Sequence, residues 1–379
     1  MQKIAIIQKY IPQYRREFFV RLREELRHKN IDLLLIYGQP NIKDALKNDA
    51  VDLDWAVKVP NKIIKIGRKD LFWQPVFSYL QNVDLVIVEQ ASKLLINYLL
   101  ILQNRFRKIK LAFWGHGKNF QEQSANRLGE WIKQKVSNQV HWWFAYTNSS
   151  AQVVINNGFP FEKVTVVQNT VDTLTIHDDY LQLSKTEINK AASELGLKSR
   201  QVGLFVGGMY PEKKLSFLMH SLYLIKKQIP DFEMIFLGNG IEASIVQNAA
   251  QKNNWIHYVG TKFDHEKLSY FALAKILLVP YSAGLVILDS FALETPLIAV
   301  DSPLHGPEIS YVTNGNNGKL INSPCSSEDY ANEVVEVLNN QQAYDNLVNN
   351  CRISFKTYTI EKMVANFVDG IEKALSTKV

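Results

Sequence analysis

A loop near the middle of the chain combines glycines with a cationic side chain. Val206 ends a predicted strand, Gly207 and Gly208 follow it, and Lys213 stands where a helix is expected to begin. Glycines let the backbone turn sharply, and a lysine beside free backbone N–H groups supplies positive charge for an anion. The loop therefore predicts a phosphate site, with Lys214 as the alternative cation. For a lysine taken alone, a solvated helix start is the commoner interpretation.

A second segment places a glycine turn between a strand and a helix. The predicted strand ends at Pro280, Gly284 makes the turn, and the helix begins near Leu285. The free N–H groups of Leu285 and Val286 suit a diphosphate. Asp289 follows one turn later, where its carboxylate can meet ribose hydroxyl groups. An ordinary strand–turn–helix connection with an exposed aspartate explains this segment equally well.

A histidine between two glycines is the third candidate. His116 lies between Gly115 and Gly117, in the segment Trp114–Asn119 that follows a predicted strand. Glycines on both sides let the backbone bend and present the imidazole, whereas a structural histidine commonly sits in an apolar face. We therefore expect His116 to be functional.

A third glycine loop lacks the acidic residue that a dinucleotide site requires. Gly238 and Gly240 fit a loose GxGxxA pattern. A dinucleotide fold requires an acidic residue about 20 positions later, after the next strand. Tyr258 and Val259 occupy that region, so NAD binding is excluded.

Short strand patterns alternate with helical patterns along almost the whole chain, which is typical of parallel α/β sheets. The 379 residues exceed what one hydrophobic core usually serves. We therefore expect two doubly wound Rossmann-like domains facing across a cleft, with boundaries at residues 1–175 and 176–358. A helix at 359–379 can pack back on the first domain. The predicted strands are Lys3–Ile7, Asp32–Tyr37, Val83–Glu89, Lys110–Trp114, Trp142–Tyr146, Val164–Gln168, Gly203–Val206, Glu233–Leu237, Ile256–Val259, Ile276–Val279 and Leu297–Val300.

Together these segments resemble the family-4 retaining glycosyltransferases, which have the GT-B fold. The stretch Pro280–Pro296 is similar to the family signature, in which two glutamates eight positions apart surround a Gly-Leu helix start. Asp289 replaces the second glutamate and Tyr281 the first, as in a variant that lacks the first glutamate. Gly208 stands where the family's phosphate-loop arginine is expected, and Lys213 keeps its lysine.

The resemblance implies roles for the residues that match. Asp289 is expected to bind the ribose, Lys213 the leaving diphosphate, and His116 the donor sugar or the attacking hydroxyl group. The residues implied in nucleotide binding are Gly207, Gly208, Lys214, Gly238, Gly260, Thr261, Tyr281, Gly284, Leu285 and Val286. Those implied on the acceptor side are Tyr10, Tyr14, Arg15 and Asn169.

The resemblance also implies an activity. The expected enzyme is a retaining, hexosyltransferase-like glycosyltransferase that needs no metal or other cofactor. It would move a sugar from a UDP- or GDP-linked donor to a glycan or lipid-linked acceptor, as in bacterial surface-polysaccharide synthesis. A nucleotide-sugar 2-epimerase, which shares the fold, is one alternative. A non-catalytic nucleotide-sugar-binding or membrane-associated scaffold is the other, motivated by Gly208 and Tyr281.

Charge and cysteine content indicate the location. Residues 1–175 carry 25 Lys and Arg against 15 Asp and Glu, and residues 176–379 carry 18 against 22, so the net charges of +10 and −4 give +6. No nucleic-acid-binding module accompanies the basic half. Two isolated cysteines fit a reducing cytoplasm. We expect a cytoplasmic protein, peripheral at the inner face of the plasma membrane.

The predicted helix Gln13–Lys29 is the candidate for contact with anionic lipid. Tyr14, Phe18, Leu22 and Leu26 recur at helical spacing. Basic residues occupy most of the remaining positions, and a solvated charged face is the alternative explanation. The residues of this expected lipid surface are Arg15, Arg16, Arg21, Arg23, Arg27, Lys29, Arg105, Arg107, Lys108 and Lys110.

Overall fold

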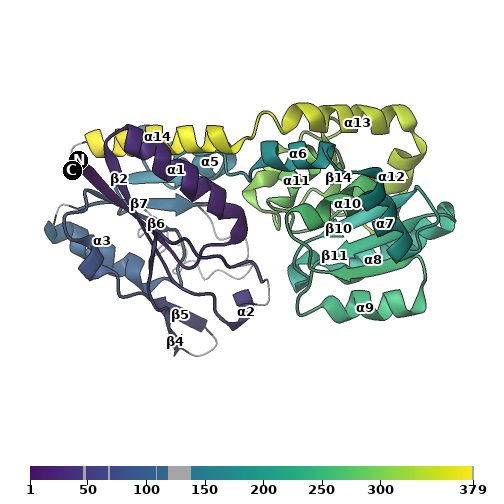
Figure 1. The fold of residues 1–379 in the computed structure, drawn as a ribbon, viewed down its shortest axis with the longest axis horizontal. Coiled ribbons are helices and arrows are strands. Elements are labelled where there is room, and N and C mark those ends of the chain that lie inside the picture. The colour runs from purple at the N-terminus through teal and green to yellow at the C-terminus, as the bar shows by residue number, and fades with distance from the viewer. Residues whose placement is uncertain (46–47, 67–68, 108, 118–137, 378–379) are drawn as a thin grey trace. The chain divides into compact units, whose positions relative to one another are not determined.

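The chain forms two compact α/β units. The structure, a computed structural model, describes residues 1–45, 48–66, 69–107, 109–117 and 138–377. Unit 1 comprises Met1–Asn169 and Ile360–Val379, and unit 2 comprises Thr170–Thr359. In each unit a parallel sheet is covered by helices (Figure 1). This architecture and its structural relatives, given below, confirm the predicted GT-B fold class.

Seven parallel strands form the sheet of unit 1, counted over the described residues, in the order β3-β2-β1-β6-β7-β8-β9. Their near-continuous apolar runs follow from burial on both faces. Buried residues of α1 and α14 cover one face, and those of α3 and α5 cover the other. The strands are β1 (Gln2–Gln8), β2 (Ile31–Tyr37), β3 (Val57–Lys58), β6 (Leu85–Glu89), β7 (Lys110–Gly115), β8 (Trp142–Ala145) and β9 (Val164–Val166).

The helices of unit 1 begin at local signals. Thr147 caps α5 through its side chain, which accepts a hydrogen bond from the backbone N–H of Ser150. The predicted helix at 13–29 is divided, because a single 3-10 turn precedes α1. The 3-10 turns are η1 (Gln13–Arg15), η2 (Phe77–Leu80) and η3 (Phe161–Lys163), and the α-helices are α1 (Arg16–His28), α2 (Ile42–Ala45), α3 (Leu95–Arg107), α5 (Asn148–Asn156) and α14 (Ile360–Ser376).

The helix α14 completes unit 1 from the far end of the chain. Its Phe367 stacks on Phe144 of β8, with the ring centroids 4.4 Å apart, and meets the Trp114 ring edge-on at 4.9 Å. Gly370 allows this close packing, because a Cβ there would lie 2.6 Å from Oγ1 of Thr165. The last helix is therefore part of the core of the first unit.

A two-stranded antiparallel hairpin, absent from the sequence prediction, also belongs to unit 1. It consists of β4 (Lys62–Ile66) and β5 (Lys69–Trp73). Phe72 of β5 joins it to the start of α3, because its backbone N–H donates to the carbonyl of Lys93 at 2.8 Å. In Figure 1 the hairpin lies below α3.

Unit 2 has a six-stranded parallel sheet in the order β12-β11-β10-β13-β14-β15. The strands are β10 (Val202–Val206), β11 (Glu233–Leu237), β12 (Ile256–Gly260), β13 (Ile276–Leu278), β14 (Leu297–Val300) and β15 (Gly318–Ile321). The order reverses between β10 and β13, and ligands of such sheets bind at the carboxyl ends of the strands near this switch point. The helical segments are α6 (Thr173–Leu181), α7 (Lys185–Leu195), η4 (Pro211–Lys213), α8 (Leu215–Gln228), α9 (Ala243–Lys252), α10 (His265–Leu273), α11 (Val286–Ala292), η5 (Pro307–Tyr311), α12 (Ser327–Asn339) and α13 (Gln341–Ser354).

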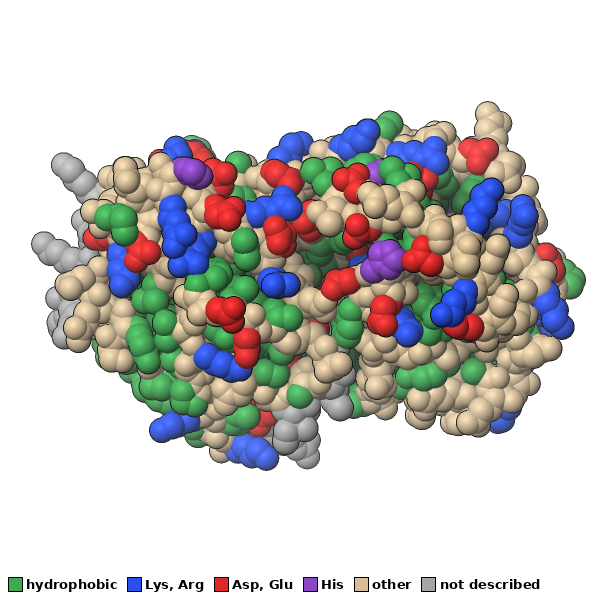
Figure 2. Space-filling view, viewed as in Figure 1, with side chains coloured by type: hydrophobic (Ala, Val, Ile, Leu, Met, Phe, Trp, Pro, Cys, Tyr) green, Lys and Arg blue, Asp and Glu red, His purple; other side chains and the backbone are tan. Residues whose placement is uncertain are grey.

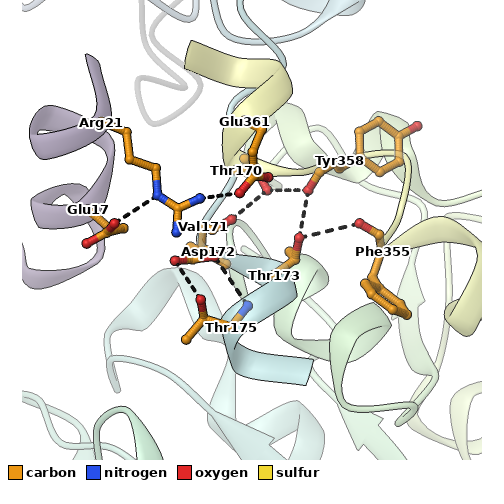
Figure 3. Close-up of polar contacts among 10 residues, drawn as sticks. All are labelled: Glu17, Arg21, Thr170, Val171, Asp172, Thr173, Thr175, Phe355, Tyr358 and Glu361. Carbon is orange, nitrogen blue, oxygen red and sulfur yellow. Dashed lines mark hydrogen bonds and ion pairs between the residues drawn. The ribbon is translucent and has the colours of Figure 1, made fainter. Parts of the chain in front are cut away.

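The chain enters and leaves unit 2 at two adjacent segments. The hydroxyl groups of Thr170 and Thr173 both donate to the carbonyl of Tyr358, at 2.7 and 3.1 Å (Figure 3). Asp172 caps α6 by accepting from the backbone N–H of Thr175. In unit 1, Arg21 of α1 binds Glu361 at the start of α14. Each unit thus fixes its own side of the two chain crossings.

No helix in the described parts of the chain combines the length and the apolar character that crossing a bilayer requires.

Replacing Phe367 with alanine should destabilise unit 1. The substitution removes a fully buried ring from an aromatic cluster, which typically costs about 3 to 5 kcal/mol. Urea unfolding followed by tryptophan fluorescence measures the loss, since Trp114 and Trp143 lie in this unit. Phe161→Ala is the matched control, because its side chain is 72% exposed. Equal effects of the two substitutions would contradict the role given to α14.

Candidate functional site

The loops at the carboxyl ends of β10 and β13 meet at the switch point of unit 2. Lys213, which follows β10, donates from Nζ to the carbonyl oxygen of Ser282, which follows β13, at 2.7 Å. Ser282 has φ of +55°, an uncommon conformation for a residue with a side chain. The bond therefore joins the two predicted phosphate segments into one site.

The Lys213 side chain is half-buried and forms no ion pair with a carboxylate among the described residues. Burial lowers its pKa to about 8, and Glu212 opposes this shift. A half-buried cation that contacts only a neutral carbonyl is destabilised by lost hydration, and an anion would restore its stability. This is the strongest chemical indication of an anion site in unit 2.

Glycines bring the backbones of neighbouring loops into direct contact at this site. A Cβ on Gly238 would lie only 1.9 Å from the carbonyl oxygen of Gly207, and both residues have positive φ. The backbone N–H of Gly238 in turn donates to the carbonyl of Gly260 at 2.8 Å. Thr261 is exposed beside it. The structure thus places the predicted glycines of three loops at one edge of the sheet.

Asp289 lies in the first turn of α11 and is buried. Its Oδ1 is 2.7 Å from Nζ of Lys267, a residue of α10 that sequence reasoning missed. Leu285 and Val286 start the helix, as predicted, and are half-buried. The lysine partner supplies the counter-charge that a buried carboxylate requires. No motif signals Lys267, because the pairing depends on how α10 packs.

Tyr281 and Gly208, the two departures from the family pattern, have clear environments. The Tyr281 side chain is only 6% exposed and packs edge-on against Phe217, with the ring centroids 5.3 Å apart. Nζ of Lys214 lies 4.0 Å from the centre of the Tyr281 ring. A Cβ on Gly208 would stand 2.2 Å from Cε2 of Tyr210, so an arginine there would require the Tyr210 ring to move. The ammonium group of Lys214 therefore lies against an aromatic ring, and Lys213 is the lysine whose ammonium group reaches the loop after β13.

Two residues of the loop after β14 complete the site. His305 is buried, accepts from the backbone N–H of Ala283 at Nδ1 (3.0 Å), and donates from Nε2 to the carbonyl of Val300 (2.6 Å). Burial lowers the pKa of His305, which keeps this neutral tautomer. No role was predicted for His305 from the sequence.

The carboxylate of Glu308 faces the glycine turn that leads into α11. Glu308 is 3% exposed, and its Oε2 lies 2.7 Å from a Cβ placed on Gly306 and 3.8 Å from one placed on Gly284. A carboxylate therefore stands beside Gly284, although position 281 carries no glutamate. The Gly-Pro-Glu sequence at 306–308 was the sequence feature that could have indicated Glu308. Its proximity to Gly284 is seen only in the folded structure.

In unit 1 the predicted acceptor-side residues gather around Tyr146. Arg15 is 3% exposed, with its guanidinium carbon 4.3 Å from the ring centre of Trp114 and 5.5 Å from that of Tyr146. Nη1 of Arg15 donates to Sδ of Met363 at 3.9 Å. The backbone N–H of Asn169 donates to the carbonyl of Tyr146 at 2.8 Å. Arg15 and Asn169 are therefore brought together with the aromatic cluster.

His116 belongs to the same cluster. Its ring centroid is 4.4 Å from that of Tyr146, and burial, followed by the charge of Arg15, lowers its pKa to about 4. The backbone N–H of Gly117 donates to Oε1 of Gln90 at 3.1 Å, which holds the loop. Lys118 and Asn119, the end of the quoted motif, lie outside the described residues. His116 is thus a neutral imidazole at pH 7.

The remaining acceptor-side residues are the two tyrosines near η1. Tyr14 is 42% exposed, whereas Tyr10 is half-buried and close to Asp49. Burial, followed by the charge of Asp49, raises the pKa of the Tyr10 hydroxyl group. The Tyr10 hydroxyl group is therefore protonated at neutral pH.

Several basic residues of α1 have partners inside unit 1. Arg21 binds Glu17 and Glu361, and Lys29 lies 3.2 Å from Glu372. The guanidinium carbon of Arg23 is 4.4 Å from the Trp55 ring centre. The expected lipid surface on this helix is thus partly engaged in internal contacts. Of its more distant members, Lys108 and the side chains of Arg105 and Arg107 lie outside the described parts of the chain.

The sequence analysis assigned no residues to a metal, although Asp52 and Asp54 have Asp-x-Asp spacing. Asp52 forms an ion pair with Lys58 at 2.8 Å and accepts from the hydroxyl of Tyr37 at 3.2 Å. In the described residues, no group of three or more His, Cys, Asp or Glu side chains has an arrangement that could hold a metal ion.

Comparison with known proteins supports this description. Residues 200–340 match the family described as "Glycosyl transferases group 1". Spore coat protein SA of Bacillus subtilis (strain 168) is 25% identical over 207 residues, which are 51% of this chain and 54% of that protein. The matched part thus spans about half the length of that curated relative.

Solved structures resemble the whole chain. HepE of Anabaena in complex with UDP-glucose superposes with a TM-score of 0.72 at 17% identity, covering 98% of this chain and 100% of HepE. TarM of S. aureus, a G117R mutant in complex with fondaparinux, alpha-GlcNAc-glycerol and UDP, gives a TM-score of 0.66 at 11% identity, with 100% of both chains covered. At these identities the likeness shows the fold.

The burial of His116 predicts a pH dependence of stability. The ordinary pKa of 6.5 in the unfolded chain exceeds the folded value of about 4, so only the unfolded chain gains a proton between them. The free energy of unfolding should therefore fall by roughly 3 kcal/mol as the pH drops from 6.5 to 4. In the His116→Gln variant this part of the loss should vanish, as measured by urea unfolding across that range. Parallel pH profiles of the two proteins would show that His116 is exposed.

Proposed function

We propose that this chain, a group 1 glycosyltransferase with the GT-B fold, transfers a sugar from a UDP-sugar donor to an acceptor hydroxyl group. The observation that carries the proposal is the half-buried ammonium group of Lys213, which lies at the switch point of unit 2 with its pKa lowered to about 8. The match of residues 200–340 to the family covers this site. UDP is preferred to GDP because HepE and TarM are described in complexes with UDP or UDP-glucose.

The proposed reaction exchanges one bond at the anomeric carbon for another. The bond from that carbon to the β-phosphate oxygen breaks, and the acceptor oxygen forms its new bond on the same face of the sugar. The acceptor proton passes to the leaving phosphate. Negative charge grows on the diphosphate during this step, so stabilisation is most effective where that charge develops.

Unit 2 residues supply that stabilisation in the proposal. Lys213 pairs with the diphosphate, and the backbone N–H groups of Leu285 and Val286 bind it at the start of α11. Asp289, neutralised by Lys267, binds the ribose hydroxyl groups through its remaining acceptor sites. With this set, the transfer is proposed to need no metal ion.

We assign recognition of the donor sugar to Glu308. Its carboxylate lies beside Gly284, the turn that leads into the diphosphate-binding helix. A buried carboxylate accepts hydrogen bonds from sugar hydroxyl groups strongly. Glu308 would therefore bind the donor sugar in place of the family's first glutamate, whose position is occupied by Tyr281.

On the acceptor side, His116 is proposed to accept a hydrogen bond from a sugar or acceptor hydroxyl group. Its low pKa leaves the imidazole neutral, so one ring nitrogen can act as an acceptor. Arg15, Tyr10, Tyr14 and Asn169 would position a glycan or lipid-linked acceptor.

Cys325 and Cys351 are both free thiols, which agrees with a cytoplasmic location.

Lys213→Ala should lower donor turnover roughly 10- to 100-fold, because one charge-assisted contact contributes about 1.5 to 3 kcal/mol. UDP affinity measured by calorimetry and UDP release with a panel of UDP-sugars test the proposal. Lys252→Ala, which alters an exposed lysine of α9, is the control and should match the wild type. Unchanged UDP affinity and turnover in Lys213→Ala would refute the phosphate assignment.

Glu308→Gln should weaken binding of the donor sugar without affecting binding of the nucleotide. Losing one charged acceptor should weaken binding of the preferred UDP-sugar roughly tenfold and leave UDP binding unchanged. The ratio of the two dissociation constants, measured for both proteins by calorimetry, reports this effect. An equal loss for UDP and UDP-sugar would mean that Glu308 acts on the loop structure instead.

A further inference from the structure

Unit 1 carries an apolar surface that includes none of the candidate-site residues. It is formed by the β4–β5 hairpin and the outer face of α3, and we call it the hairpin–α3 surface. Figure 2 shows hydrophobic side chains gathered over α3 and basic side chains at the hairpin. The exposed apolar residues of this surface are Ile63 (42%), Ile64 (44%), Tyr98 (41%), Leu99 (38%) and Leu102 (52%).

The helix α3 is apolar on both faces. Ile96, Leu100 and Ile101 are buried against the sheet. Tyr98, Leu99 and Leu102 share the opposite face, because residues three and four apart are neighbours on a helix. A helix that covers a sheet usually carries polar residues on its outer face. Sheet packing explains only the inner face of α3.

The hairpin continues this surface. Ile63 pairs with Phe72, and Phe72 is joined to Leu94, immediately before α3, by an isolated bridge. Ile63 and Ile64 are consecutive in a strand, so their side chains point to opposite faces of the hairpin. Ile63 shares its face with Phe72, which is buried in the core of unit 1, yet Ile63 itself stays 42% exposed. The hairpin therefore presents an exposed aliphatic side chain on each of its two faces.

Exposed lysines surround these apolar residues. Lys62, Lys65 and Lys93 are all exposed. Asp70 lies opposite Lys65 in the hairpin, so the described charges of this surface remain positive in balance. Lysines can lay their aliphatic stems along apolar material and keep the ammonium group at an anionic surface. Such a combination favours an anionic bilayer over a protein partner with mixed charge.

We propose that the hairpin–α3 surface docks unit 1 onto an anionic lipid bilayer. Ile63, Ile64, Leu99 and Leu102 would enter the boundary between headgroups and acyl chains, with Tyr98 at headgroup level. The lysines would bind lipid phosphates. This surface, rather than the basic face of α1, would then hold the protein at the membrane.

The test is binding of the full chain to vesicles without donor, so its outcome is independent of sugar transfer. Vesicles containing phosphatidylglycerol should bind the protein, and vesicles of phosphatidylcholine alone should bind it much less. Raising the salt concentration should weaken binding to the anionic vesicles, because screening reduces the lysine contribution. Equal, salt-insensitive binding to both vesicle types, or binding to neither, would overturn the proposal.

Two sets of variants separate the apolar and the charged contributions. The double variant Ile63→Ser, Leu102→Ser and the double variant Lys62→Gln, Lys65→Gln should each weaken binding to anionic vesicles roughly tenfold or more. Phe161→Ser and Lys252→Gln are matched controls at exposed positions elsewhere and should bind as the wild type does. Thermal unfolding confirms that each variant is folded, since all altered side chains are exposed.

Other occupants of the surface give different results. If Ile63→Ser, Leu102→Ser bound vesicles normally but abolished a concentration-dependent dimer of the wild type in sedimentation, a second copy of the chain would be the partner. That result would replace the lipid proposal.

Discussion

The bond from the Lys213 ammonium group to the Ser282 carbonyl is the interaction on which the candidate site of unit 2 depends. It crosses the switch point of the sheet and holds a half-buried cation where no carboxylate balances it among the described residues. Such a cation is tolerated only because the surrounding backbone is fixed. Gly207 and Gly238 approach too closely for side chains, and His305 holds the Ser282 loop from behind through Ala283. The loops are therefore shaped before any ligand arrives.

Most of the sheet architecture could be predicted from the sequence because the strands are buried on both faces. Their apolar runs are continuous, so the strands at Glu233–Leu237 and Leu297–Val300 were located to the residue. The β4–β5 hairpin was missed, because lysines interrupt its aliphatic residues and mask the strand pattern. The helix at Thr173–Leu181 was not predicted, since its weak apolar pattern resembles that of a loop.

Site residues that lie within one local loop could be predicted from the sequence. Site residues that reach the site from distant elements could not, because their positions depend on packing. Lys213 and Asp289 stand in recognisable loops, so their positions followed from local order. Lys267 and Glu308 reach the site from other elements, and no spacing rule relates them to their neighbours. In unit 1, a helix pattern indicated that Arg15 was exposed, but η1 turns its guanidinium group inward onto Trp114. Burial of a charge among aromatic rings has no sequence signature.

The return of α14 to unit 1 has a consequence for synthesis on the ribosome. Unit 2 is a continuous stretch of chain, Thr170–Thr359, whereas the core of unit 1 needs residues that are translated after all of unit 2. Until α14 emerges, the sheet face that receives Phe367 stays uncovered. The usual order, in which the domain nearest the N-terminus matures first, is therefore reversed. Unit 1 can therefore complete its core only after unit 2 has been synthesised.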